Sequence, residues 1–273
     1  MKKIIGSLGF VGTMLASTVA SAALVTEWDF QAVTVFSGST FSSGSGVKID
    51  TANLVSWGAN AGASTATRHT QAGLSSSRSR SALGMTAGDV SGVLLTNNVL
   101  PEFSGQITHY NNAIQLSFAS LLSTSITSNL FLTPKTPVGE PVPLDPKTFN
   151  VRFTETPNIA RCGFESITSC DDIFVISLGD LDFTFDYNGY RYTVGIVADG
   201  LGPLTKLQCE KAGAAEGCIG FKTEEAKFTQ VNFGLLISAR SLEVPEPSVL
   251  ALLGLSLIGL GFSGRRKLSG MFS

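Results

Sequence analysis

The sequence predicts an all-β protein whose exported part is an antiparallel β-sandwich of the jelly-roll-like or Ig-like kind. Short apolar segments alternate with polar residues at the period of two that half-buried strands require. Gly- and Ser-rich stretches separate these segments, and no long apolar stripe with the helical period of 3.6 appears. We therefore divide the chain into a leader at residues 1–22, a sandwich at 23–243 and a C-terminal segment at 244–273.

The N-terminus has the three parts of a secretory signal peptide. Lys2 and Lys3 precede an apolar stretch at residues 4–19, and Ala20-Ser21-Ala22 forms a small-residue cleavage site. The mature chain is therefore predicted to begin at Ala23. No Arg pair precedes the apolar stretch, so the general secretion machinery is the expected partner rather than the twin-arginine route.

The first strand is predicted over residues 26–35. Trp28, Phe30 and Ala32 share one face of it, and acidic or amide side chains occupy the other. Gly- and Ser-rich segments at 37–46 and 58–81 then interrupt the apolar pattern.

The chain contains two histidines, and one of them lies in a motif, Thr108-His109-Tyr110-Asn111. If this motif is a strand, His109 and Asn111 share one face, where an imidazole and an amide could act together. The alternative is a structural histidine whose ring nitrogens bridge a turn to a neighbouring strand. No G-x-S-x-G motif identifies a nucleophile.

A proline-rich stretch follows at residues 134–146. It has five prolines and cannot supply a regular ladder of hydrogen bonds. We expect a long connection between two sheets or two subdomains, and a subdivision of the sandwich here is one alternative.

All four cysteines lie in the second half of the mature chain, and an even count in an exported protein favours disulfides. Three pairings are open, and the local one is the simplest because it closes short loops. The gaps lack the paired spacing of a zinc site. The local pairing joins Cys162 to Cys170 and Cys209 to Cys218.

A β-hairpin is predicted over residues 181–197. Its turn is Asn188-Gly189, which suits the two positive φ angles of a type I′ turn. Further strands are expected at 173–178 and 228–237, where the apolar character is nearly continuous. The two-residue turn pairs Tyr187 with Tyr190, Asp186 with Arg191, Phe185 with Tyr192 and Phe183 with Val194.

Charge limits the function classes. Residues 23–246 contain 14 Lys and Arg against 21 Asp and Glu, a net charge of −7, so nucleic acid is not an expected partner. No cofactor is predicted. Calcium is the candidate metal, with Asp180, Asp182 and Asp186 on one face of the hairpin, although Arg191 is an alternative partner for Asp186.

The C-terminal segment has a tripartite pattern. Val244-Pro245-Glu246-Pro247 precedes an apolar run at 249–262, and Arg265-Arg266-Lys267 follows. The run has 14 residues, which predicts a marginal, transient transmembrane helix with the basic cluster on the cytoplasmic side. A plain single-pass anchor and a glycolipid-anchor signal are the alternatives.

This pattern resembles the PEP-CTERM sorting signal of Gram-negative bacteria. The resemblance implies recognition and cleavage by an exosortase-type processing protease and a precursor held briefly in the inner membrane. The product would then reach the cell surface, the outer envelope or the extracellular matrix.

A second resemblance joins Trp57-Gly58 and Thr108-His109-Tyr110-Asn111 to two downstream segments. Together they are similar to the THxN family of PEP-CTERM proteins, which has no established activity. The downstream segments are Glu155-Thr156-Pro157-Asn158 and, with Cys162 before it, Cys170-Asp171-Asp172-Ile173-Phe174-Val175.

Two functions follow as alternatives. The first is a noncatalytic, surface-sorted protein with a structural or adhesive role, associated with the extracellular polysaccharide layer of a biofilm. The second is a secreted glycan-binding module or hydrolase, stabilised by calcium in one version. A hydrolase would need an acid and base pair, for which Asp182 with Glu155 or Glu165 is the available set. A cleft that gathers His109 with two carboxylates would favour the hydrolase.

Overall fold

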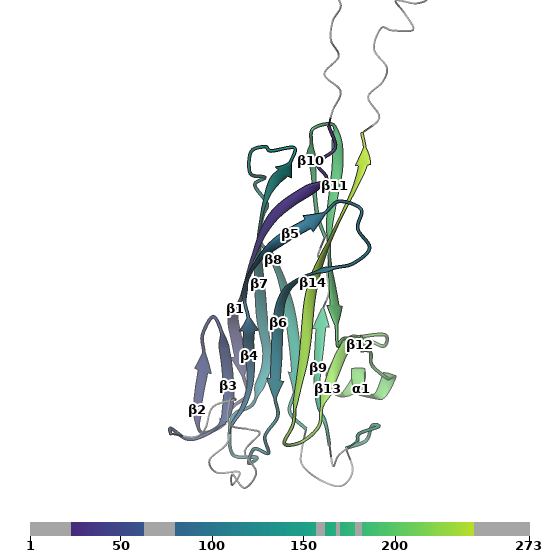
Figure 1. The fold of residues 1–273 in the computed structure, drawn as a ribbon. Coiled ribbons are helices and arrows are strands. Elements are labelled where there is room, and N and C mark those ends of the chain that lie inside the picture. Colours follow the sequence, from purple (N-terminus) through teal and green to yellow (C-terminus); the bar gives the residue numbers. More distant parts are fainter. Residues whose placement is uncertain (1–22, 63–79, 157–161, 168–169, 178–181, 243–273) are drawn as a thin grey trace, which may run out of the picture.

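The computed structural model describes residues 23–62, 80–156, 162–167, 170–177 and 182–242. These residues form two antiparallel seven-stranded sheets packed face to face, with one short helix (Figure 1). The predicted β-sandwich is therefore confirmed. Among the described residues, no helix is long and apolar enough to cross a membrane.

In the first sheet, β7 and β1 lie toward the edge formed by β5, and these two long strands make its most extensive pairing. Its order is β12 (Gly202–Pro203), β13 (Ile219–Thr223), β9 (Asp172–Ser177), β8 (Lys147–Thr154), β7 (Leu121–Thr136), β1 (Glu27–Phe41) and β5 (Asp89–Leu95).

The second sheet faces the first, and β14 and β6 lie near its centre. Its order is β10 (Phe183–Tyr187), β11 (Tyr190–Asp199), β14 (Phe228–Ser241), β6 (Glu102–Tyr110), β4 (Ser81–Ala87), β3 (Leu54–Ala59) and β2 (Val47–Asp50).

Strand β1 has the predicted alternation but is longer than expected. Trp28, Phe30 and Ala32 are buried, as the period-two pattern requires. The strand continues past the predicted end at residue 35 to Phe41, with a bulge near Gly38, because β7 beside it has 16 residues and supplies partners. Serine and glycine residues therefore remain in the ladder where composition alone predicts a loop.

The hairpin of β10 and β11 has the predicted register. Its four expected pairs, including Asp186 with Arg191 and Phe185 with Tyr192, are all present. Asn188 and Gly189 have φ angles of 46° and 74°, which a type I′ turn requires. The expected strands at 173–178 and 228–237 are β9 and β14.

The proline-rich stretch differs from the expectation in what it connects. Pro134 lies within β7, and residues 137–146 join β7 to β8. These two strands are neighbours in one sheet, so the stretch does not link two sheets. Val142 donates its backbone N–H to Leu132, which holds the connection against β7.

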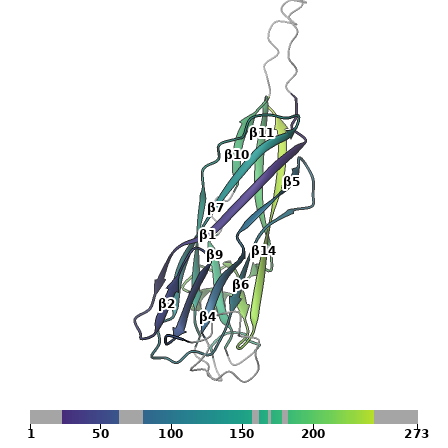
Figure 2. The same ribbon diagram turned by 60° about the vertical axis from the view of Figure 1, so that its left-hand side comes forward.

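The interior contains two apolar clusters along the length of the sandwich, which Figure 2 shows as elongated. One surrounds Trp57, and the other surrounds Trp28, which contacts the Phe185, Tyr187 and Tyr192 rings edge-on. Trp28 on β1 and Trp57 on β3 belong to different sheets, and both are buried between them. Each sheet therefore has an apolar inner face that packs against the other.

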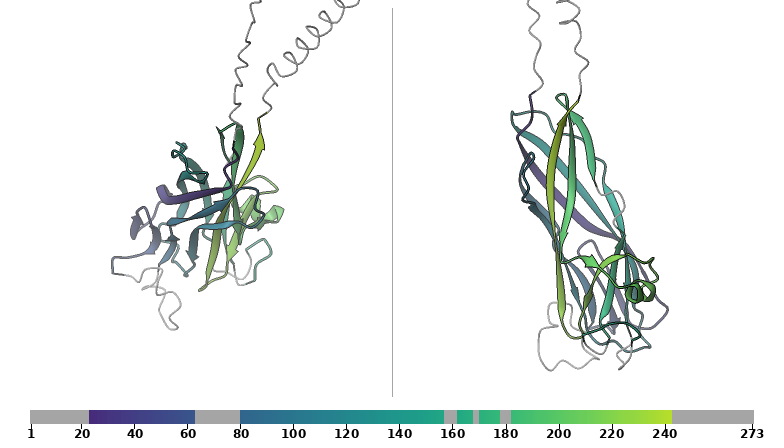
Figure 3. Two further views of the ribbon diagram at one scale, coloured as in Figure 1. Left: turned by 45° about the horizontal axis from the view of Figure 1, so that its top comes forward. Right: turned by 90° about the vertical axis from the view of Figure 1, so that its right-hand side faces the viewer.

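The two ends of the sandwich differ. Strand β14 runs the length of the sandwich, from Phe228, which pairs with Tyr110 of β6, to Ser241, which pairs with Tyr190 of β11 (Figure 3, right). The backbone N–H of Val25 donates to the Tyr192 hydroxyl, and Leu242 donates to Gly189. The first and last described residues therefore lie together at the hairpin end, which we call the terminal tip.

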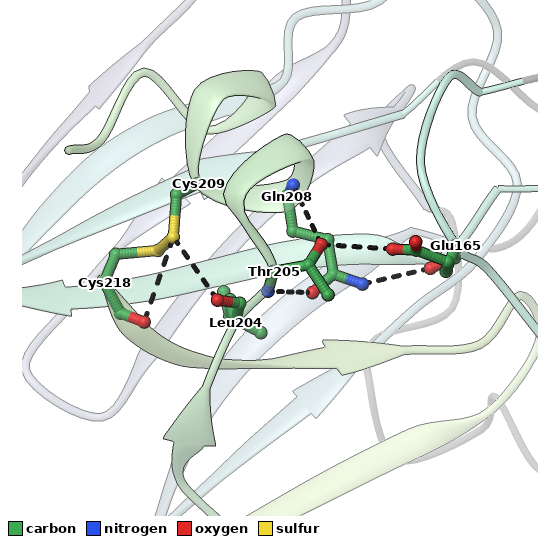
Figure 4. Close-up of a disulfide and its surroundings, with 6 residues drawn as sticks. All are labelled: Glu165, Leu204, Thr205, Gln208, Cys209 and Cys218. Carbon is green, nitrogen blue, oxygen red and sulfur yellow. Dashed lines mark hydrogen bonds between the residues drawn. A yellow bond between two sulfur atoms is a disulfide. The ribbon is translucent and has the colours of Figure 1, made fainter. Parts of the chain in front are cut away.

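Helix α1 (Lys206–Lys211) lies on a loop between β12 and β13 (Figure 4). Thr205 and Gln208 form a capping box, and Gln208 also donates to the Glu165 carbonyl. A disulfide joins Cys209 to Cys218 and closes this loop, so this predicted pair is present. Cys170 is buried and Cys162 is half-buried, and their mutual pairing stays a prediction.

Candidate functional site at the motif end of the sandwich

The Thr108–Asn111 motif lies at the end of the sandwich opposite the terminal tip, which we call the motif end. Thr108, His109 and Tyr110 complete β6, and Asn111 follows directly. His109 and Asn111 both point between the sheets and are fully buried. Thr108 is buried too, but it lies on the opposite face of β6 and hydrogen-bonds to Thr86 there. The shared face expected for His109 and Asn111 is therefore present.

His109 packs against aromatic side chains. Its ring stacks parallel to Trp57 at 6.2 Å and meets Phe153 edge-on at 5.0 Å. Phe153, Phe174 and Phe221 occupy paired positions on β8, β9 and β13, so they form one row across the inner face of the first sheet. His109 lies opposite this row, in an apolar environment.

A second row, of polar residues, lies two residues further along the same three strands, at or just beyond their ends. Asp172 pairs with Thr223, two positions along from Phe174 and Phe221. The register of β8 with β9, continued by one residue, places Glu155 opposite Asp172. Because paired residues share a face, Glu155, Asp172 and Thr223 all point inward. Asn111 reaches this row from the second sheet, and its amide nitrogen donates to the Thr223 carbonyl at 3.0 Å.

Asp172 is buried and Glu155 is half-buried, and each carboxylate has hydrogen-bond donors at one of its two oxygens. Trp57 Nε1 donates to Glu155 Oε2 at 2.9 Å. The Thr156 backbone N–H and hydroxyl donate to Asp172 Oδ1 at 2.9 and 3.2 Å. The same hydroxyl lies 2.9 Å from the Cys170 carbonyl. These bonds tie together the segments that carry the motifs at 57, 155–156 and 170–172.

Burial raises the pKa of both carboxyl groups well above their ordinary values. For Glu155, loss of solvation is the main cause, and the nearby negative charge of Asp172 adds to it. For Asp172, burial again dominates, while the Thr156 hydrogen bonds act in the opposite direction. Burial also raises the pKa of Glu225, which contributes negative charge to both sites.

The geometry limits what this site can do chemically. His109 has no exposed surface, and Asp172 has about as little, so neither side chain is presented to a dissolved substrate. His109 lies one pleat from the row that contains Glu155 and Asp172, inside the sandwich rather than in an open cleft. No group of three or more His, Cys, Asp and Glu side chains within the described ranges is arranged to hold a metal ion.

The other sequence candidates lie elsewhere. Asp186 is exposed and accepts two hydrogen bonds from Arg191, at 2.7 and 2.8 Å, which accounts for its carboxylate without calcium. Asp182 is exposed at the edge of the sheet, and Asp180 lies outside the described residues. Glu165 is exposed beside α1, where it accepts a hydrogen bond from the Thr205 hydroxyl, and the pairing of Asp182 with Glu155 or Glu165 stays a prediction.

Sequence reasoning placed Asp172 in a family resemblance, placed Glu155 there and in a candidate acid and base pair, and missed Thr223. The sequence did contain a signal for the two carboxylates. Each lies two residues from a phenylalanine of an apolar strand, so each is expected on the same face of the strand as that ring. Thr223 carries no motif, and only the pairing of β13 with β9 brings it to the row.

The C-terminal segment indicates the class of protein. Residues 243–267 match the PEP-CTERM protein-sorting motif. The chain is therefore an exported protein that an exosortase processes from a membrane-anchored precursor. No curated protein matches the chain.

The predicted processing residues lie outside the described part of the chain. These are Ala20 and Ala22 of the cleavage site, and the sorting residues Val244, Pro245, Glu246, Pro247, Arg265, Arg266 and Lys267. Ala23, the predicted first mature residue, is the first described residue.

Proposed function

We propose that the mature protein is a noncatalytic component of the cell surface or extracellular polysaccharide layer of a Gram-negative bacterium. The observation that carries this proposal is the complete burial of His109 among Trp57 and Phe153. A general acid or base must reach the proton that it transfers, and an imidazole packed between aromatic rings inside a sandwich serves the core.

The same burial disfavours the alternative of a carbohydrate-binding module built on tryptophan. Trp28 and Trp57 both have 0% exposure, so neither ring is offered to a sugar face. Their places in the two interior clusters account for both residues.

A polar outer face supports contact with polysaccharide through hydrogen bonds. On β1, β7 and β8, Thr127 hydrogen-bonds to Ser37 and Thr148, and Ser125 donates to Asn150. These exposed hydroxyls and amides form a hydrogen-bonding array on neighbouring strands, which suits a hydroxyl-rich polymer.

We also propose that the chain belongs with the THxN proteins. The motif segments that carry this resemblance are far apart in sequence, yet Trp57, His109, Glu155, Thr156 and Asp172 form one connected cluster. A common packing requirement at the motif end explains why these residue types occur together.

The test is co-sedimentation of the mature protein with polysaccharide isolated from its host. Thr127→Glu places a charge on the hydroxyl face, and Thr184→Glu makes the same change at an exposed position of β10 in the other sheet. We expect Thr127→Glu to weaken co-sedimentation and Thr184→Glu to leave it unchanged. Turnover of glycans or esters by the folded protein, with no recovery in the matrix fraction, would overturn the proposal.

A further inference from the structure

Four oxygen atoms at the motif end are buried without a hydrogen-bond partner. Within the described residues, no donor reaches Glu155 Oε1, Asp172 Oδ2, Thr223 Oγ1 or Asn111 Oδ1. Buried polar atoms are satisfied in the great majority of cases, so four together require an explanation. Asn111 and Thr223 are neutral and fully buried, and they indicate a missing partner independently of the two acids.

The four residues that carry these atoms are neighbours in the fold. Asp172 lies beside Thr223 in the ladder of β9 and β13, and Glu155 follows the end of β8 on the other side of Asp172. Asn111 approaches from the facing sheet, where its other amide atom already bonds to Thr223. All four residues are at or just beyond strand ends, where backbone carbonyls also leave the ladder.

An ion pair does not explain the two carboxylates. Among the ion pairs that described residues form, none involves Glu155 or Asp172, and Lys222 is paired with Asp171 instead. An unpaired buried carboxylate is costly, so such groups are paired, coordinate a metal ion, or take up a proton.

A shared proton does not account for all four atoms. A proton held between Glu155 and Asp172 would satisfy two carboxylate oxygens at most, and the neutral atoms Asn111 Oδ1 and Thr223 Oγ1 would still be buried without a partner. The Trp57 and Thr156 donors already occupy the opposite oxygens and favour the ionised forms.

We propose that Glu155, Asp172, Asn111 and Thr223 bind a divalent cation, calcium, at the motif end of the sandwich. Two carboxylates balance its charge, and an amide and a hydroxyl oxygen complete a hard donor set of the kind that calcium prefers. Calcium takes six to eight oxygens, so water or backbone carbonyls supply the others. This proposal does not depend on the function proposed above.

Trp57 provides a direct probe of this site. Its indole nitrogen lies 2.9 Å from Glu155 Oε2, and Trp28 belongs to the other interior cluster. Terbium, which substitutes for calcium at oxygen sites, would therefore emit through energy transfer from Trp57. We expect sensitised terbium emission from the mature protein, loss of that emission on addition of calcium, and loss in Trp57→Phe with retention in Trp28→Phe.

Thermal unfolding gives an independent measurement. With a dissociation constant near 1 mM, typical of extracellular modules, about 10 mM calcium should raise the Tm by roughly 3–6 °C relative to a chelator. Asp172→Asn and Glu155→Gln should each abolish this shift. Thr223→Val, a smaller change, should reduce the affinity several-fold.

Asp186→Asn is the matched control, because it makes the same acid-to-amide change at an exposed residue paired with Arg191. It should keep the full calcium response. The proposal fails if the folded wild-type protein shows neither a calcium-dependent Tm nor sensitised terbium emission. It also fails if folded Asp172→Asn responds as the wild type does. Because the wild-type titration is decisive alone, a variant that does not fold leaves the test intact.

Discussion

Trp57 and Glu155 are joined across 98 residues of sequence by a hydrogen bond from the indole nitrogen to the carboxylate. This bond links β3 of one sheet to the end of β8 in the other. It therefore couples packing of the interior cluster to the electrostatics of the polar row.

Replacement of Trp57 by phenylalanine should destabilise the protein by about 2–4 kcal/mol. The change leaves a cavity and removes the donor to a buried carboxylate, and both effects are costly. The measurement is urea unfolding followed by circular dichroism. Phe131→Leu, on the exposed outer face of β7, is the control and should change stability by less than about 0.5 kcal/mol. Equal effects of the two variants would contradict the coupling described here.

Removal of the Cys209–Cys218 disulfide should have a local effect. The loop it closes is short, so chain entropy limits its contribution to about 2–3 kcal/mol. In Cys209→Ser/Cys218→Ser we expect faster amide exchange around α1 and an unchanged sheet signal. Loss of the whole sheet on mild reduction would show that this loop supports far more of the fold.

The intact mass of the mature protein should report the remaining cysteines. Two disulfides would add about 4 Da on reduction, and Cys209–Cys218 alone would add about 2 Da. We expect the larger change, because the sequence predicts that Cys162 and Cys170 also pair. The smaller change would exclude that pair.

Alkaline pH should destabilise the terminal tip. Burial raises the pKa of the Tyr192 hydroxyl above its ordinary value of 10.0, and this hydroxyl accepts the Val25 N–H. Since the folded state binds the phenolic proton more tightly than the unfolded state, stability is complete below pH 10 and falls as the pH rises above it. Tyr192→Phe should be less stable at neutral pH but should have a flatter alkaline profile. An identical pH dependence in wild type and variant would refute this assignment.

Alteration of the sorting motif should leave an unprocessed precursor. With Pro245, Glu246 and Pro247 all replaced by alanine, exosortase recognition is lost and the C-terminal segment is retained. The measurement is the intact mass of the protein in the membrane and released fractions. A correctly trimmed, released variant would show that these residues are dispensable for sorting.

Local pattern was enough to predict some elements and not others. The Asn188-Gly189 turn and the alternation around it specify four cross-strand pairs, because a two-residue turn fixes the register. The shared face of His109 and Asn111 likewise follows from alternation along one strand. The capping box of Thr205 and Gln208 was present in the sequence and could have predicted α1.

The candidate site needed long-range information. Thr223 pairs with Asp172 only because β13 lies beside β9. Strands β10 to β12 separate these two strands in the sequence, and no local signal predicts the pairing. The length of β1 was also not predictable from local sequence. Its Ser and Gly residues stay in the strand because β7 provides partners for them. The sequence predicted calcium at the acidic residues of the hairpin. In the structure, Arg191 donates hydrogen bonds to Asp186, and the buried oxygens that lack donors lie at the motif end instead.

The placement of both chain ends at the terminal tip has a mechanical consequence. Strand β14 has 14 residues and is about 45 Å long, so a precursor held by its C-terminus extends the motif end that far outward. Tension between that attachment and a ligand at the motif end would act along β14. The hydrogen bonds to β6 and β11 are perpendicular to the strand, and they would resist such tension together in shear rather than open one at a time.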